Sequence, residues 1–145
     1  MTDARQLLLD YLGSAAVAAG ALFADDGVLE LPYLASLGLP PRYTGPAEIT
    51  QFLTFLHDQL YPGFHFDDID VHAAGPDRAY GEYLIAARSG ISGKSVRQQF
   101  FGHLTAQGGK ISLLREAIDV IVAADAIFPG GLEEVVKTRA GAVTA

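Results

Sequence analysis

Apolar residues recur every three or four positions in two stretches of the first half of the chain, which is the spacing of a helix face. The first stretch covers residues 3–24, and Gly13-Ser14 is expected to break or kink it, with Ser14 capping the second part. The second stretch begins at Pro46, a residue type favoured at a helix start, and ends at Pro62-Gly63. The pattern therefore predicts two helical regions before residue 64.

Runs of β-branched and aromatic residues, separated by glycine-containing turns, predict strands in the second half of the chain. Between the helices we expect a short strand at residues 28–31 and then a loop at 33–45. That loop is unusually apolar, and such loops often cover the mouth of a pocket. The four long strands are expected at residues 64–73, 78–88, 95–106 and 108–122.

Helices that precede an antiparallel sheet are typical of the α+β fold class. A long sheet with helices on one face tends to curl around them, so we expect a cone with an internal pocket. One domain is predicted over residues 1–128. Residues 129–145 are predicted to form a tail, in which 132–139 can form a short helix.

Composition and charge narrow the class of protein. The net charge of −7 opposes binding to nucleic acid, and the chain has no cysteine for a disulfide or a thiolate metal site. No apolar run approaches the length of a membrane span. The first residues lack the basic-then-apolar order of a signal peptide, which favours a cytoplasmic location.

Glu116 is the leading candidate for chemistry. On a strand, side chains alternate between faces, so Glu116 shares its face with Ser112, Leu114 and Ile118. If this face lines the pocket, loss of hydration raises the pKa of the carboxyl group and suits it to acid/base catalysis near neutral pH. The alternative is that Glu116 pairs with an arginine or faces solvent.

Three further residues are candidates for a second acid/base group. Glu82 lies in the middle of a predicted strand, and the alternative is an outward Glu82 that pairs with an arginine. His57 lies beside the apolar stripe of the second helical region, where it could be a proton shuttle or a half-buried structural residue. His103 shares a face with Phe101, and the register that would place this face inward is open.

A metal site is not expected. Residues 64–72 contain two histidines and three aspartates, but alternation on a strand sends His65 and Asp67 to one face and Asp68, Asp70 and His72 to the other. No cofactor is expected either, because proton transfer requires only positioned acids and bases.

Three segments resemble the NTF2-like superfamily, and within it the SnoaL-like group related to ketosteroid isomerase. The resemblance covers roughly residues 3–128 and implies a cone-shaped, mainly antiparallel sheet wrapped on helices, often as a homodimer. Members include isomerases, polyketide cyclases, dehydratases and proteins without known catalysis, so the fold does not select one function. The matching segments are 21–32 (ALFADDGVLELP), 43–49 (YTGPAEI) and 108–119 (GGKI…REAID).

Site residues carry over from the family only in part. Where the isomerases have their aspartate base this chain has Leu31, and near their protonated aspartate it has Phe101 and Gly102. Tyr11 is a loose match to their helix tyrosine. Ketosteroid isomerase chemistry is therefore rejected, whereas the acid/base carboxylate that cyclase-like members place on the last strand has its match in Glu116.

Two functions are compatible with these residues. One is an enzyme that binds a small, largely apolar, cyclic or polyketide-like molecule and uses Glu116 for cyclisation, isomerisation or dehydration. The other is a non-catalytic ligand-binding or dimerisation module. The residues predicted to line the pocket are Tyr11, Leu31, Tyr33, Phe52, Leu56, Phe101, Leu114 and Ile118.

Overall fold

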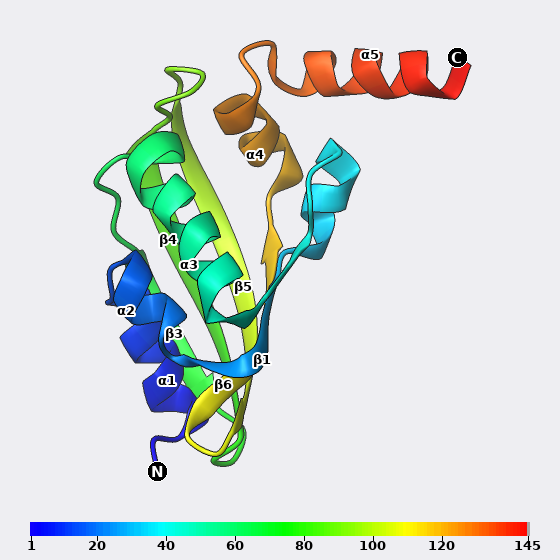
Figure 1. The fold of residues 1–145 in the computed structure, drawn as a ribbon. Helices are drawn as coiled ribbons and strands as arrows, with labels where there is room; N and C mark the ends of the chain where they lie inside the picture. Colours follow the sequence, from blue (N-terminus) through cyan, green and yellow to red (C-terminus); the bar gives the residue numbers. More distant parts are fainter. Residues whose placement is uncertain (145) are drawn as a thin grey trace.

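A curved sheet wraps around the first helices in the computed structural model, which describes residues 1–144 (Figure 1). The strand order is β2-β1-β6-β5-β4-β3, and β1 with β6 is the parallel pair in an otherwise antiparallel arrangement. This confirms the predicted α+β class. The elements are α1 (Ala4–Leu12), α2 (Ala16–Gly20), β1 (Phe23–Glu30), the 3₁₀ helix η1 (Pro32–Leu37), β2 (Arg42–Thr44), α3 (Gly45–Phe55), the π-helix η2 (Leu56–Leu60), β3 (Asp67–Ala73), β4 (Arg78–Arg88), β5 (Ser95–Gln107), β6 (Lys110–Ile118), α4 (Val120–Ile127) and α5 (Gly131–Thr144).

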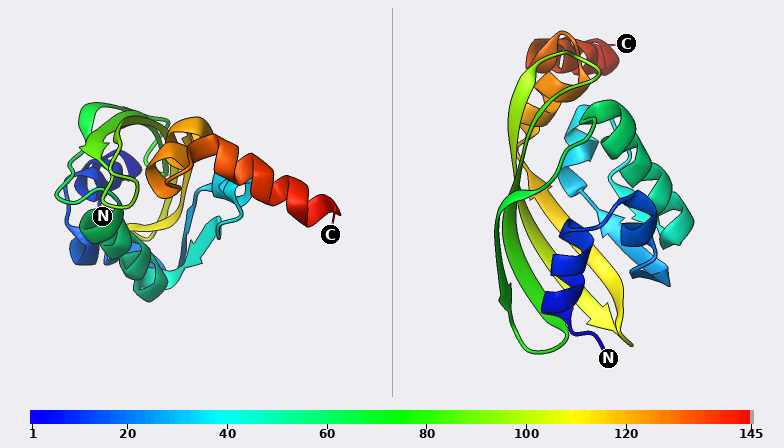
Figure 2. Two further views of the ribbon diagram at one scale, coloured as in Figure 1. Left: turned by 90° about the horizontal axis from the view of Figure 1, so that it is seen from above. Right: turned by 90° about the vertical axis from the view of Figure 1, so that its left-hand side faces the viewer.

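The helices α1, α2 and α3 cover the concave face of the sheet, and its convex face is left open (Figure 2). On β5, residues with even numbers from Gln98 to Ala106 are buried, whereas Phe101 is exposed. The buried side chains of the concave face meet those of the helices in one apolar core. The concave face of the sheet is therefore where a buried site can form.

The predicted helix over residues 3–24 is wrong at its end. Gly13 ends α1, and Ala15, not Ser14, precedes the first residue of α2. The chain is then already a strand at Phe23, which pairs with Ile111 of β6. The ladder of hydrogen bonds to β6 outweighs the local helix propensity of this alanine-rich segment.

The predicted loop at 33–45 contains two short elements. Pro32 opens η1, and Gly38 follows it with a φ of 75°, a left-handed conformation that favours glycine. The strand β2 then pairs with β1 before α3 begins. These elements lie over one side of the concave face, where they close the apolar cavity described below.

The predicted strand over 108–122 is also wrong at its end, since β6 stops at Ile118 and α4 follows. The Asp119 carboxylate accepts hydrogen bonds from the backbone N–H groups of Ile121 and Val122, which is the role of a helix N-cap. The Gln98 side chain bonds both the N–H and the carbonyl of Asp119. Local β-branched residues predicted a strand, but this capped turn starts a helix.

The last helix, α5, extends away from the rest of the molecule (Figure 1). It is longer than the helix expected at 132–139, and Arg139 donates a 2.6 Å hydrogen bond from Nη1 to the Ser36 carbonyl of η1. The division into a domain at 1–128 and a tail remains a prediction. Among the helices of residues 1–144, none combines the length and the apolar character that a membrane crossing needs.

Candidate functional site

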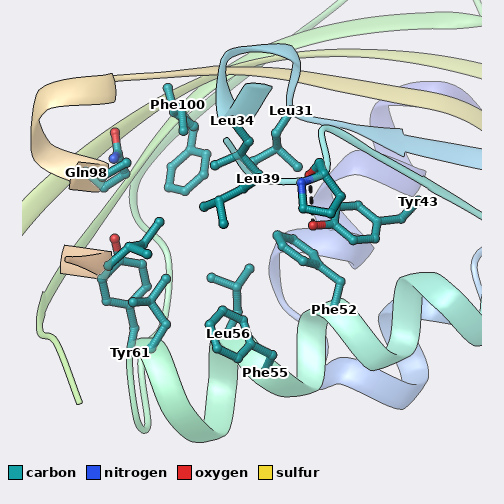
Figure 3. A pocket seen from close by; sticks show the side chains of 15 residues that line it. Leu31, Leu34, Leu39, Tyr43, Phe52, Phe55, Leu56, Tyr61, Gln98 and Phe100 are labelled. Carbon is teal, nitrogen blue, oxygen red and sulfur yellow. Dashed lines mark hydrogen bonds between the residues drawn. The ribbon is translucent and has the colours of Figure 1, made fainter. Parts of the chain in front are cut away.

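An apolar cavity of about 150 Å³ lies between the sheet, α3 with η2, η1 and α4 (Figure 3). Gln98 lies at one end of the cavity, where its side-chain amide donates a hydrogen bond to the Asp119 carbonyl. Tyr43 lies at the other end, where its hydroxyl donates to the Pro40 carbonyl at 3.0 Å. Such a cavity favours an apolar ligand. Its lining consists of Leu31, Leu34, Leu39, Pro40, Tyr43, Phe52, Phe55, Leu56, Leu60, Tyr61, Gln98, Phe100, Ile118, Ala123 and Ile127.

Glu116 is buried on the concave face of β6, with 3% of its surface exposed. The Tyr83 hydroxyl, from β4, donates a 2.5 Å hydrogen bond to Glu116 Oε2. Burial raises the pKa of Glu116 to about 7, and the bond from Tyr83 offsets part of that rise. Near neutral pH the carboxyl group is therefore divided between its charged and neutral forms.

Gly102 makes room for this hydrogen bond. It lies on β5 directly between Glu116 of β6 and Gly81 of β4, and a Cβ at position 102 would overlap the Tyr83 hydroxyl oxygen. The Tyr83 side chain can therefore cross β5 to reach Glu116. Sequence reasoning missed Tyr83, and the available signal was a glycine in the interior of two neighbouring long strands.

Glu116 faces a chamber of about 10 Å³, the size of one water molecule. Tyr11 of α1 also lines this chamber, and burial together with the charge of Glu116 raises the pKa of Tyr11 well above its usual value. The site thus gathers one carboxyl group and two phenols in the buried interior. The Glu116 chamber is lined by Tyr11, Ser14, Ala19, Leu53, Leu56, His57, Phe64, Phe66, Phe100 and Glu116.

Leu56 and Phe100 separate the Glu116 chamber from the apolar cavity, because both side chains line both spaces. Phe100 is held by stacking on Tyr83, with ring centroids 5.7 Å apart, and by an edge contact with Phe66. Glu116 itself does not line the apolar cavity. The two spaces are therefore neighbours, with the side chains of Leu56 and Phe100 between them.

His57 lies in η2, next to Leu56, and also lines the Glu116 chamber. Its ring stacks on Phe64 at a centroid distance of 4.3 Å. Burial lowers the pKa of His57, and the nearby charge of Asp58 partly opposes this. Of the three predicted partners for Glu116, His57 is the one that the structure brings to it.

The other two predicted partners, Glu82 and His103, lie on the convex face, away from Glu116. Glu82 is exposed, and the His103 ring stacks on Tyr80 at 4.7 Å. Phe101, expected in the pocket, is 55% exposed on the same face. Phe100 takes the buried face of β5, so its odd-numbered neighbours Phe101 and His103 point the other way. Glu82 of β4 is paired with Phe101 and therefore shares its convex face.

Four of the predicted lining residues do lie at the apolar cavity, namely Leu31, Phe52, Leu56 and Ile118. Tyr11 faces the Glu116 chamber instead, and Leu114 is fully buried in the core. Tyr33 was expected in the pocket but is 50% exposed on η1. Its neighbours Leu34 and Leu31 take the inward positions.

Metal-ligating side chains do not gather at this site. Within residues 1–144, no three His, Asp or Glu side chains form a group that could hold a metal ion. His65 pairs with Asp67 at 3.1 Å and His72 pairs with Asp70 at 3.0 Å, both at the surface. The groups at the site are suited to moving protons.

Comparison with known proteins gives one family and many similar folds. The model of the SnoaL-like domain matches residues 13–114. A phenazine biosynthesis-related protein from Pseudomonas aeruginosa is 18% identical with a TM-score of 0.73, and the match covers 85% of this chain and 83% of that one. No curated protein matches the chain.

Two further solved structures have the same fold. An NTF2-like protein from Burkholderia thailandensis E264 is 20% identical with a TM-score of 0.73, covering 87% of this chain and 98% of that one. A presumptive polyketide cyclase from Pseudomonas putida KT2440 is 17% identical with a TM-score of 0.70, covering 88% and 99%. At these identities the similarity is one of fold.

Proposed function

This chain belongs to the SnoaL-like domain family, and from that premise we propose that it binds a small apolar molecule in the apolar cavity and that Glu116 transfers a proton to or from it. The reaction is of the cyclase, isomerase or dehydratase type and needs no cofactor. A presumptive polyketide cyclase is among the proteins of similar fold. Reactions of this type depend on positioned acids and bases.

The protonation state of Glu116 carries the proposal. A buried carboxyl group with a pKa of about 7 can accept or donate a proton without a large energetic cost at neutral pH. The hydrogen bond from Tyr83 fixes its orientation. A surface carboxylate with an ordinary pKa would be a much weaker base.

The size of the apolar cavity indicates the size of the ligand. A cavity of about 150 Å³ with apolar walls accepts a single benzene-sized ring. The ligand we propose is therefore monocyclic, with one carbonyl group whose neighbouring C–H is acidic enough to exchange. Rotation of the Leu56 and Phe100 side chains would bring that group to Glu116.

Deuterium exchange tests the proposal without knowledge of the natural substrate. Small cyclic ketones are incubated with the protein in D₂O, and deuterium at the α-carbon is measured by mass spectrometry. We expect incorporation by the wild type, with a rate that rises as the pH passes through 7 and Glu116 becomes a charged base. Glu116→Gln should bind the same ketones, seen by NMR shifts, but lose incorporation by about 10²-fold or more.

A non-catalytic ligand-binding module is the second candidate. The wall of Leu56 and Phe100 between the ligand space and Glu116 favours it. This candidate predicts that the wild type and Glu116→Gln both bind the ketones and that neither incorporates deuterium faster than the ketone alone in D₂O. That result would contradict the catalytic candidate.

We also propose that the protein forms a homodimer through the convex face of the sheet. Phe101 and Tyr80 are 55% and 44% exposed there, and Glu82 lies directly beside Phe101 on the neighbouring strand. Arg97 belongs to the same face, so a two-fold axis can bring Glu82 of one copy and Arg97 of the other together around the aromatic residues. The second copy would cover these rings.

A further inference from the structure

The Glu116 chamber has a second wall, on the side away from the apolar cavity. Beyond this wall lies an open groove of about 400 Å³, which we call the outer groove. Four residues line both the chamber and the groove, namely Ser14, His57, Phe64 and Phe66. Glu116 is therefore separated from the outer groove by one layer of side chains.

Only one of these four side chains can carry a proton between the two spaces. Phe64 and Phe66 are apolar, and the Ser14 hydroxyl donates to the Asp10 carbonyl at 2.5 Å. The His57 imidazole has two nitrogens, so it can accept a proton on one of them and donate a proton from the other. It is thus the single group in this wall that is suited to proton transfer.

The π-helix explains how two consecutive residues serve opposite sides of the chamber. In η2 the Tyr61 N–H bonds the Leu56 carbonyl at 2.8 Å, five residues back, which widens the turn. Leu56 lines the chamber and the apolar cavity, whereas His57 lines the chamber and the outer groove. Such π-turns are frequent at functional sites.

We propose that Glu116 exchanges its proton with solvent through His57 and the outer groove, while the ligand approaches from the apolar cavity. The neutral imidazole accepts a proton from a hydronium ion in the groove, which becomes water. The imidazolium then gives the proton of its other nitrogen to the Glu116 carboxylate through one water molecule, for which the chamber has room, and becomes neutral again. The reverse sequence discharges Glu116. The catalytic benefit, a site reset without release of the ligand, rests on the proposed function.

The ionisable groups around His57 are compatible with this relay. Asp58 of the same helix favours its charged form, and burial favours its neutral form. Tyr11 of α1 and Glu116 of β6 face it across the chamber, and His65 lies beside it in the outer groove. Burial is the larger of the two effects and lowers the pKa of His57 below its usual value, so the relay starts from the neutral imidazole.

Carbon-13 NMR of Glu116 tests the relay on the protein alone. With ¹³C-labelled glutamate carboxyl groups and Glu116→Gln to assign the signal, the proton-exchange rate is obtained from line shapes near pH 7. His57→Phe keeps an aromatic ring against Phe64 but removes the nitrogens, and we expect the exchange rate to fall by roughly 10²-fold. His65→Phe, in the same groove but outside the chamber, should leave the rate unchanged.

A second variant distinguishes loss of the imidazole from a change in side-chain packing. In His57→Ala, added imidazole should restore exchange in proportion to its concentration. A wild-type rate in His57→Phe, or a rate in His57→Ala that does not depend on imidazole, would overturn the relay. Because these rates need no ligand, their outcome is distinct from that of the deuterium experiment, which tests whether Glu116 acts on a ligand at all.

Discussion

Tyr83 and Glu116 are 33 positions apart in the chain, and their hydrogen bond limits the effect of burial on the Glu116 carboxyl group. Burial of Glu116 raises its pKa, while the Tyr83 hydroxyl stabilises the charged form and limits the rise. The bond exists because residue 102, between them, is a glycine. The missing side chain at residue 102 thus permits the one hydrogen bond that counteracts burial at Glu116.

Gly102→Ala tests this dependence. The new Cβ would displace the Tyr83 hydroxyl, so the pKa of Glu116 should rise further above about 7, and the free energy of unfolding should fall by about 1–3 kcal/mol. Carboxyl NMR and urea unfolding measure the two effects.

Gly81→Ala is the matched control, since its Cβ would meet Leu8 and Val71, each at 3.2 Å. It should cost stability without moving the pKa, and an unchanged Glu116 pKa in Gly102→Ala would contradict the argument.

At the scale of elements, the junction between β6 and α4 shapes one end of the apolar cavity. Asp119 caps α4, and the Gln98 side chain holds the Asp119 backbone against β5. Ala123 and Ile127 of α4 then face the cavity. A strand continued beyond Ile118 would leave that end of the cavity without a wall.

Asp119→Ala should weaken this junction. Loss of the two N-cap hydrogen bonds is expected to lower the free energy of unfolding by about 1 kcal/mol, because the first N–H groups of α4 lose their acceptor. Asp119→Ser keeps an acceptor oxygen and should cost much less. Chemical unfolding followed by circular dichroism measures both, and equal stability of the alanine variant and the wild type would rule out the cap as a stabilising feature.

At the scale of the whole molecule, the sheet has two different faces, of which only the concave one is covered by helices (Figure 2). The concave face holds the apolar cavity and Glu116, whereas the convex face presents Phe101, Tyr80 and His103. Exposed aromatic rings on an uncovered sheet face favour association. The two faces therefore separate the proposed chemistry from the proposed dimer contact.

Phe101→Lys should dissociate the proposed dimer, because it places a charge where the partner's ring would pack. Sedimentation velocity over a range of concentrations measures the mass. Ile121→Lys is the control, since Ile121 is 58% exposed but lies on α4, outside the convex face. A wild-type protein that stays monomeric at all concentrations would refute the dimer.

Much of the fold followed from local patterns. The α+β class, the long antiparallel strands and the resemblance to SnoaL-like proteins were predicted from the sequence and are confirmed. Two element ends were wrong, at Phe23 and after Ile118, where strand pairing and a side-chain cap override propensity. The predicted loop at 33–45 also contains η1 and β2, and the strand expected from residue 64 begins at Asp67. The pairing of β1 with β6 joins residues that are distant in the chain, and the start of α4 depends on the single carboxylate of Asp119.

The sequence by itself determined that Glu116 shares a face with Leu114, because alternation is a property of the extended backbone. The catalytic role of Glu116 remains a prediction. Only the tertiary structure decided that Phe100, not Phe101, faces inward, that Tyr83 meets Glu116, and that Leu56 and His57 form opposite walls of one chamber. Strand register and packing fix which side chains meet, and both depend on contacts between elements that no local pattern contains.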